Sequence, residues 1–586
     1  MRRVGLPAAV LGAVLLLGAP EAAAFDFVLL ERDVSLDLTL STLFHYHDDN
    51  NNGPLENRLH EDDFYEDFQN RLTALLASGS WSLGLRLDHL VFIDLYPERE
   101  PGTFRNENLF RPGTTVPRDV GLAPYLFEKV WGRYADETID ATIGDFYATF
   151  GRGLALSVRK VDELGVDTTI RGARFHAALG TVELEALGGL VNPANLETSR
   201  ELLIRDPDDA LAGARAAVQL PAGITLGLNA VYAALYYAGG NRGDEPRVDN
   251  LLAGGDIEAL GLADGLLDLF FEGSYQGRDP FGQLTAELDR VAYDAGHGYG
   301  LYGGAVLYLD PVTVTLELKD YNQLYLVDER IKLQIDPNPG GSPTLEATDL
   351  YLHAPPSFER EDQEVPQQFN VLGGRLKIDA HVEALGLDLS ARYLLYWLDD
   401  RTELGAERFP QDWRIYHLLL SAELTLDRGG HLMLGGGFRE EYKGRIERAD
   451  RVESSLEGQL GHAELEVKLP VSGRHSLGLT VRHEEEFKSQ IGRFREGDVA
   501  LEYAFAPHFT LGATFDYTSH RLFVSKGRDW QPYFGGYLAL RNARAGSSSS
   551  LRLFGGGRRG GQRCIGGQCR IYPPFVGLEL TATIRY

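Results

Sequence analysis

The chain has 586 residues, of which 24% are charged, and its formal net charge is -28. This acidic balance excludes a small nucleic-acid-binding module, which needs clustered Lys and Arg. Past the N-terminus no run of about 18 uncharged apolar residues occurs, which excludes a bundle of membrane-spanning helices. The 28 Phe and 27 Tyr exclude a disordered chain. Glycine is abundant, and apolar residues alternate in short runs, which favours β-structure.

The first 24 residues have the pattern of a secretory signal peptide. Arg2 and Arg3 precede an apolar stretch at residues 6–17, and small residues at 22–24 suit a cleavage site. We therefore predict that residues 1–24 are a cleaved signal peptide and that residues 25–586 form a single domain. No cysteine follows the apolar stretch, so a lipid anchor there is excluded. A signal peptide implies export from the cytoplasm.

Segments of alternating apolar and polar residues follow from about Val34 to the C-terminus. At 312–319, for example, valines and leucines alternate with Thr313, Thr315, Glu317 and Lys319. Such strands fit either a soluble sandwich or a transmembrane barrel. The connections favour the barrel, because short turns alternate with long loops. We therefore predict an all-β fold: a transmembrane antiparallel β-barrel of about 24 strands (22–26) in the cell outer membrane, its lumen partly filled by inward-folded segments.

One weak calcium motif lies in the first long loop. Three oxygen-bearing residues alternate before Gly53, as in the start of a calcium loop, but position twelve is Leu59 instead of Glu. The candidate ligands are Asp48, Asn50 and Asn52. A plain polar turn is the alternative.

A second weak motif lies just before that loop. His45 and His47 point to the same side of an expected strand, but the sequence places no further metal ligand next to them. The alternative interpretation is that they mark the point where the strand leaves the membrane. We predict no metal and no cofactor.

One segment breaks the alternation of turns and loops. Strands are expected near 34–46, 66–79, 80–95, 125–136 and 138–148, and the next strand of correct direction is 167–178. We therefore expect residues 150–166 to fold into the lumen or cap it. The alternative is an irregular register with one miscounted hairpin. Without this segment the count is 24, an even number. A barrel of this size encloses a wide lumen that we expect to be partly filled. Besides residues 150–166, the loops 98–120 and 328–365 are candidates for the segments that fill it.

The sequence around this segment resembles a known family. Residues 144–154 (GDFYATFGRGL), 164–174 (LGVDTTIRGAR) and 566–575 (GGQCRIYPPF) are similar to an uncharacterised family of large bacterial outer-membrane proteins. The resemblance implies a porin-like outer-membrane barrel and brings no established activity with it.

Charged residues are frequent in and beside the irregular segment. We predict that they form a charged constriction, since acidic and basic groups facing one another across a pore orient polar solutes. An ion-pair network that pins an inserted loop is the alternative. The candidates are Asp145, Arg152, Arg159, Lys160, Asp167, Arg171 and Arg174.

The chain has two cysteines, Cys564 and Cys569, in its last long loop. Four intervening residues with a Gly-Gly centre and an oxidising compartment favour a disulfide between them. Free thiols or a partial metal site are the alternatives, and two thiolates without a nearby His make a poor zinc site.

The C-terminal strand ends on an aromatic residue. Its alternating apolar residues resemble the assembly signal of outer-membrane proteins: Leu580, Ala582, Ile584 and Tyr586. The resemblance implies the barrel-assembly machinery as a partner. We also expect contact with outer-membrane lipid and lipopolysaccharide, and none with nucleic acid.

The function predicted from these features is a channel or transporter for polar solutes across the outer membrane. The alternative is a plugged export or assembly barrel, or a structural surface-binding barrel, acting with a periplasmic or extracellular partner. A barrel that starts near Val34 leaves no room for a separate N-terminal plug domain. No P-loop, G-x-S-x-G or H-E-x-x-H motif occurs, and we predict no enzymatic activity.

Overall fold

A computed structural model describes most of the strands and few of the long connections. The described residues are 25–29, 32–48, 65–94, 120–161, 166–192, 196–197, 202–203, 209–236, 247–280, 297–322, 324, 333–334, 344–345, 371–399, 412–426, 429–448, 451–489, 491–521, 524, 527–544, 547–565, 568–572 and 574–585. Among these residues no helix is both long and apolar enough to cross a membrane.

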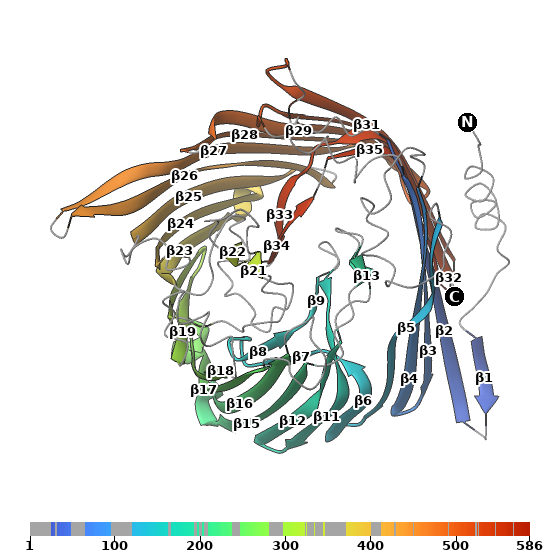
Figure 1. Cartoon of the computed structure of the whole chain (residues 1–586), viewed down its shortest axis with the longest axis vertical. Coiled ribbons are helices and arrows are strands. Elements are labelled where there is room, and N and C mark those ends of the chain that lie inside the picture. Colours follow the sequence, from blue (N-terminus) through green and yellow to red (C-terminus); the bar gives the residue numbers. More distant parts are fainter. Residues whose placement is uncertain are drawn as a thin grey trace.

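The described strands build one closed antiparallel barrel of 24 strands (Figure 1). Its first half comprises β2 (Arg32–His47), β3 (Tyr65–Ser78), β4 (Trp81–Asp94), β5 (Val120–Ala135), β6 (Ile139–Phe146), β11 (Thr169–Leu179), β12 (Val182–Asn192), β15 (Ala210–Leu220), β16 (Ile224–Tyr236), β17 (Arg247–Gly261), β18 (Leu267–Pro280) and β19 (His297–Leu309). Its second half comprises β20 (Val312–Asn322), β23 (Val371–Val382), β24 (Leu387–Asp399), β25 (Asp412–Leu426), β26 (Gly430–Arg448), β27 (Arg451–Ser472), β28 (His475–Lys488), β29 (Gly492–Phe505), β30 (Phe509–Thr518), β31 (Gln531–Arg544), β32 (Ser547–Arg558) and β35 (Phe575–Arg585).

The barrel closes where β2 pairs with β35. The register of this seam runs from Thr39 opposite Arg585 to His47 opposite Gly577. The short strand β1 (Phe25–Leu29) pairs with the first residues of β2, next to the seam. Closure pairs the edge strands with each other, so the wall can satisfy its backbone groups in lipid.

The two faces of the wall differ as the alternation predicts. On β20, Leu316 and Leu318 are 43% and 56% exposed, whereas Glu317 and Lys319 between them are each 2% exposed and point inward. The same outward rows of exposed leucine and aromatic side chains recur around the barrel. In water such a surface would aggregate, and in a bilayer it faces hydrocarbon.

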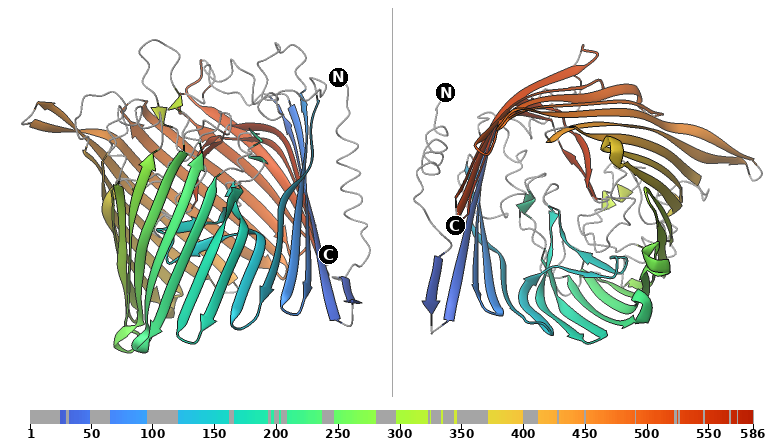
Figure 2. Two further views of the ribbon diagram at one scale, coloured as in Figure 1. Left: turned by 60° about the horizontal axis from the view of Figure 1, so that its bottom comes forward. Right: turned by 180° about the vertical axis from the view of Figure 1, so that it is seen from behind.

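Short turns gather at one end of the tilted strands (Figure 2, left). They lie at 79–80, 180–181, 310–311 and 506–508, between consecutive strands. β26 continues to Arg448 and β27 begins at Arg451, so these two strands extend beyond the wall as a projecting hairpin (Figure 1).

The chain leaves the wall after β6 and returns at β11. The intervening segment forms two small hairpins inside the barrel (Figures 1 and 2). Their strands are β7 (Ala148–Phe150) with β8 (Leu156–Val158), and β9 (Lys160–Val161) with β10 (Val166–Asp167). The expected fold class, a barrel of about 24 strands with a partly filled lumen, is confirmed.

Smaller elements complete the described part of the chain. Three two-stranded hairpins lie outside the wall's hydrogen-bond ladder: β13 (Leu196–Glu197) with β14 (Leu202–Leu203), β21 (Leu333–Gln334) with β22 (Thr344–Leu345), and β33 (Gly561–Ile565) with β34 (Gln568–Tyr572). Three single turns connect wall strands: η2 (Pro221–Gly223), α3 (Leu262–Gly265) and η4 (Glu383–Leu385).

Candidate functional site

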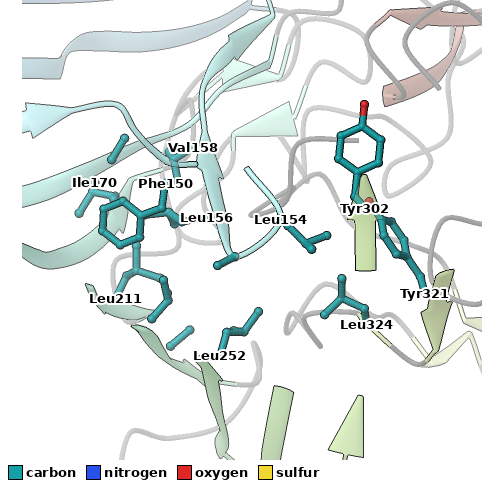
Figure 3. Close-up of a cluster of buried hydrophobic side chains, with 14 of the residues drawn as sticks. Phe150, Leu154, Leu156, Val158, Ile170, Leu211, Leu252, Tyr302, Tyr321 and Leu324 are labelled. Atoms are coloured by element: carbon teal, nitrogen blue, oxygen red, sulfur yellow. The ribbon is translucent and has the colours of Figure 1, made fainter. Parts of the chain in front are cut away.

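The lumen segment, defined here as residues 147–161 and 166–168, is held to the wall by apolar packing. Phe150 and Leu156 are fully buried, and they lie against the inward side chains Leu211 and Leu252 of the wall (Figure 3). The ring of Phe150 fits because residue 213 is glycine: a Cβ there would lie 2.9 Å from the ring. Burying one such side chain stabilises the fold by about 1.5–3 kcal/mol. The segment is therefore packed as part of the barrel.

A carboxylate on the wall fixes the turn at the tip of the β7–β8 hairpin. Glu272 of β18 accepts hydrogen bonds from the backbone N–H groups of Arg152 (2.7 Å) and Leu154 (3.1 Å). Gly151, at φ +54°, allows the left-handed turn, and a Cβ there would lie only 3.1 Å from Glu272 Oε2. One buried side chain thus fixes the position of this turn in the lumen.

The side chain of Arg152 is also bound to the wall. Its Nη2 lies 2.9 Å from Oε1 of Glu258, and its guanidinium carbon lies 3.7 Å from the ring centroid of Phe270. Cation–π contact and ion pairing both favour this position. Arg152 is therefore paired within the wall-bound turn.

The other end of the lumen segment is anchored by a buried charge cluster. Asp167 forms ion pairs with Arg86 of β4 and Lys129 of β5 and accepts a hydrogen bond from the hydroxyl of Tyr147. Burial raises the pKa of Asp167, but Lys129 and Arg86 outweigh it and lower the pKa to about 2. The carboxylate therefore stays ionised and ties the segment to two wall strands.

The wall itself opens where the segment departs. The pairing of β5 with β6 ends at Trp131 opposite Gly144, so the residues of β5 before Trp131 have no strand partner on that side within the described chain. Asp145 accepts a hydrogen bond from the backbone N–H of Val130 (2.8 Å) and pairs with Arg171 Nη2 (3.0 Å). Arg171 also donates to the backbone carbonyl of Glu128 (2.9 Å). Side chains here replace missing ladder bonds.

The seven candidate constriction residues do not form one ring. The structure brings Asp145 and Arg171 together, on the face of β11 that also carries the outward Phe175. It places Arg152 and Asp167 in two separate groups inside the barrel, and Arg174 in a cross-strand pair with Glu185 (2.6 Å). Of the remaining two residues, Arg159 is half-buried and Lys160 is exposed.

A group of charges that sequence reasoning missed lies on the opposite side of the barrel (Figure 1). On β27–β30, outward Leu477, Leu501 and Leu511 define the lipid face, and the alternate residues point inward. Between residues 461 and 518, eight inward positions are acidic and three are basic. We call the acidic ones the acidic wall: Glu464, Glu466, Glu484, Glu486, Glu496, Asp498, Glu502 and Asp516. The three basic positions are Lys468, Arg482 and Lys488.

The acidic wall is partly accessible to solvent: Glu502 is exposed and its other members are half-buried. Glu464 and Arg482 form a 2.7 Å ion pair across β27 and β28, yet their side chains are 31% and 54% exposed. The alternating pattern of carboxylates along these strands was the signal in the sequence. Inward position combined with exposure indicates a hydrated path along this side of the lumen.

The other sequence motifs are only partly described. Asp48 donates its backbone N–H to the carbonyl of Val576 (2.8 Å), whereas Asn50 and Asn52 lie outside the described residues. Cys564 and Cys569 occupy directly opposite backbone positions in the β33–β34 hairpin, and the disulfide stays a prediction. Leu580, Ala582 and Ile584 lie on β35, while Tyr586, the signal peptide, the loop 98–119 and most of 328–365 lie outside the described residues.

Comparison with known families gives one match. Residues 122–204 match a family of unknown function (DUF6029). This stretch contains the lumen segment and the sequence around it that resembles an uncharacterised family of outer-membrane proteins. No curated protein matches the chain.

Several solved outer-membrane proteins resemble the barrel. The siderophore receptor PirA from Pseudomonas aeruginosa is 7% identical, with 94% of this chain and 80% of that chain covered and a TM-score of 0.46. The P pilus usher PapC translocation pore is 9% identical, with 94% and 99% covered and a TM-score of 0.37. A BenF-like porin from Pseudomonas fluorescens is 13% identical, with 72% and 96% covered and a TM-score of 0.32. Such low values say nothing about what this chain transports or binds.

The architecture itself determines where the protein resides. A closed antiparallel wall with an apolar exterior and a charged interior is stable only across a lipid bilayer, and barrels of this kind span bacterial outer membranes. The wall described above has these properties along its whole circumference. The chain is therefore an outer-membrane β-barrel protein.

Proposed function

We propose that the protein is a channel for polar solutes that prefers cations. The lumen segment narrows the barrel on one side, and the acidic wall lines the passage on the other. The observation that carries this proposal is the inward-facing, partly accessible excess of carboxylates on β27–β30. An acidic lining attracts cations and repels anions because few fixed positive charges compensate it.

Ion pairs compensate part of the charge of the acidic wall. Arg482 pairs with Glu464, Lys488 with Glu486 (2.8 Å), and Arg559 with Glu496 (2.5 Å). Among the described residues of these inward faces, the eight acidic positions outnumber the three basic ones, even when Arg559 is added to them. The net field along this side is negative, which supports a preference for cations over anions of the same size.

The attachment of the lumen segment supports a channel with a fixed constriction. Glu272 holds the backbone of one end, and Asp167 holds the other end to Arg86 and Lys129. A plug that is displaced during export would need weaker contacts than these buried charged ones. The export, assembly and surface-binding alternatives predict a closed pore instead.

Single-channel recording from the purified full-length protein in planar bilayers tests the proposal. We expect a stable conductance and, under a potassium chloride gradient, a reversal potential that shows preference for the cation. The variant Glu466→Gln/Asp498→Asn should lower this preference, since two inward negative charges are removed. The matched control is Asp136→Asn, which removes a carboxylate from the exposed turn between β5 and β6.

The outcomes separate the two parts of the proposal. Absence of conductance contradicts the channel and favours a plugged barrel or a surface-binding role. A conductance that is anion-selective, or unchanged by Glu466→Gln/Asp498→Asn, leaves the channel intact but contradicts the acidic wall as its selectivity element. Equal effects of Asp136→Asn and the double variant would also contradict it.

A further inference from the structure

Two histidines and a carboxylate meet on the inner side of the seam that closes the barrel. His45 and His47 lie on β2, and His45 is directly opposite Asp67 of β3 on one side and Glu579 of β35 on the other. The three strands that carry these residues include the first and the last of the wall. The four side chains share the inward face because their positions are directly paired or two residues apart.

The distances between the donor atoms fit a small coordination shell. His45 Nδ1 lies 3.0 Å from Asp67 Oδ2, and His47 Nε2 lies 3.4 Å from the same oxygen. One potential ligand atom from each of His45, His47 and Asp67 can be chosen so that the three atoms lie within 4.8 Å of one another. Two donors bound at about 2.0 Å to one tetrahedral metal ion are about 3.3 Å apart. A small rotation of an imidazole ring therefore brings the set to bonding geometry.

The Nε2 atom of His47 is the clearest sign of a missing ligand at this site. This atom is buried and, apart from the 3.4 Å approach to Asp67 Oδ2, meets no hydrogen-bond partner within the described part of the chain. The ring is held in place, because it stacks on Tyr65 with centroids 3.9 Å apart and meets the edge of Phe575 at 5.0 Å. A buried, unsatisfied nitrogen costs about 1–3 kcal/mol, and coordination of a metal ion removes this cost.

Glu579 provides the outer contact that metal-binding histidines usually have. Its Oε2 lies 3.5 Å from Nε2 of His45, the ring nitrogen that faces away from Asp67. Arg552 and Arg558 each hold this carboxylate at 2.8 Å. A carboxylate on the second ring nitrogen fixes the orientation of the imidazole and raises its basicity.

We propose that His45, His47 and Asp67 bind one divalent transition-metal ion of the zinc type, with Glu579 as the partner of His45. Imidazole nitrogens suit zinc, nickel and copper, whereas calcium and magnesium prefer oxygen donors. Three protein ligands leave a fourth position for water or a solute group. The bound ion joins β2 to β3, and Glu579 extends the network to β35, so the metal also strengthens the closing seam.

Metal titration of the full-length protein in detergent tests this site, with Zn²⁺ for affinity and Co²⁺ for its visible absorption. We expect one ion per chain and intense absorption bands of tetrahedral Co²⁺. His47→Gln and Asp67→Asn should each weaken binding by more than about 100-fold, and Glu579→Gln by about 10–100-fold. The matched control is His381→Gln, because His381 forms a 2.6 Å pair with Asp388 but belongs to no metal-binding cluster among the described residues.

Two results would overturn the proposal: wild-type protein that binds no stoichiometric Zn²⁺, or binding that survives both His47→Gln and Asp67→Asn. Circular dichroism verifies that each variant keeps its β-structure. If the variants do not fold, X-ray absorption of the zinc-loaded wild type decides. Two imidazoles with oxygen donors support the site, and any other ligand set contradicts it.

Discussion

The ring of Phe150 occupies the space that a side chain at position 213 would need, since a Cβ on Gly213 would lie 2.9 Å from the ring. An inner hairpin and a wall strand are thus complementary at one residue pair. The lumen segment has a defined seat on the wall, and each of its attachments can be removed separately.

Replacing Gly213 with valine should displace the lumen segment. The added methyl groups overlap with Phe150, which destabilises the packed arrangement by about 1–3 kcal/mol. We expect a larger or noisier single-channel conductance and faster proteolysis within residues 147–161. Gly461→Val on β27 is the matched control, because a Cβ there meets no atom within 4 Å. Equal conductance and equal proteolysis of the two variants would show that the packing of Phe150 does not depend on the space above Gly213.

Replacing Glu272 with glutamine should release the turn of the β7–β8 hairpin. The amide loses the negative charge and can direct an N–H group at the backbone donors of Arg152 and Leu154. We expect a loss of about 1.5–3 kcal/mol in the free energy of unfolding, measured by urea titration. Glu258→Gln, which alters only the side-chain partner of Arg152, should cost less than about 1 kcal/mol. If Glu272→Gln lowers the free energy of unfolding less than Glu258→Gln does, Glu272 is not the residue that holds this turn in place.

Replacing Asp167 with asparagine should destabilise the barrel more strongly. It leaves Arg86 and Lys129 buried without this counter-charge, at a cost of about 3–5 kcal/mol. The control is Asp140→Asn, whose pair with Arg133 is largely exposed and contributes at most about 1 kcal/mol. Urea titration at neutral pH measures both, and equal losses would contradict the buried network.

The same residue predicts how acid acts on the lumen segment. The pKa of Asp167 is about 2 in the folded chain, below the ordinary value of about 3.9. A lowered pKa adds stability above the ordinary value, and this stability is lost as the pH falls towards 2. The difference in stability between wild type and Asp167→Asn should therefore shrink as the pH falls from about 4 towards 2. A difference that stays unchanged over this range would contradict the ionised, ion-paired state of Asp167.

The two cysteines should form a disulfide in the exported protein. Their directly opposite positions on β33 and β34 bring the backbones together as a cross-strand bridge requires. Alkylation without prior reduction should leave Cys564 and Cys569 unmodified, and mass spectrometry should show both modified after reduction. Modification without reductant would indicate free thiols.

The sequence predicts the wall well because lipid and lumen impose a period of two on every strand. Turn and loop lengths also determined the strand number, including the exclusion of residues 150–166 from the wall. The sequence does not predict which residues face each other on strands that are joined by long connections or that meet where the barrel closes. His45 is 22 residues from Asp67 and 534 from Glu579, so only the closed barrel shows that they are neighbours.

The residues predicted to form the constriction show a second limit of prediction from the sequence. Asp145 and Asp167 flank the same segment, yet Gly144, at φ +105°, and the departure from β6 lead them to different surroundings. Asp145 meets Arg171 beside the lipid face, and Asp167 meets Arg86 inside the barrel. Charge and spacing alone do not distinguish these two sides.

The unpaired stretch of β5 before Trp131 makes the barrel mechanically uneven. A continuous backbone ladder resists bending, but here β5 is joined to β6 and β11 through the side chains of Asp145 and Arg171. When lateral pressure or thickness of the bilayer changes, the circumference should flex along this line first. We therefore expect the barrel to deform along the line between β5 and β6, and this is also where the lumen segment leaves the wall.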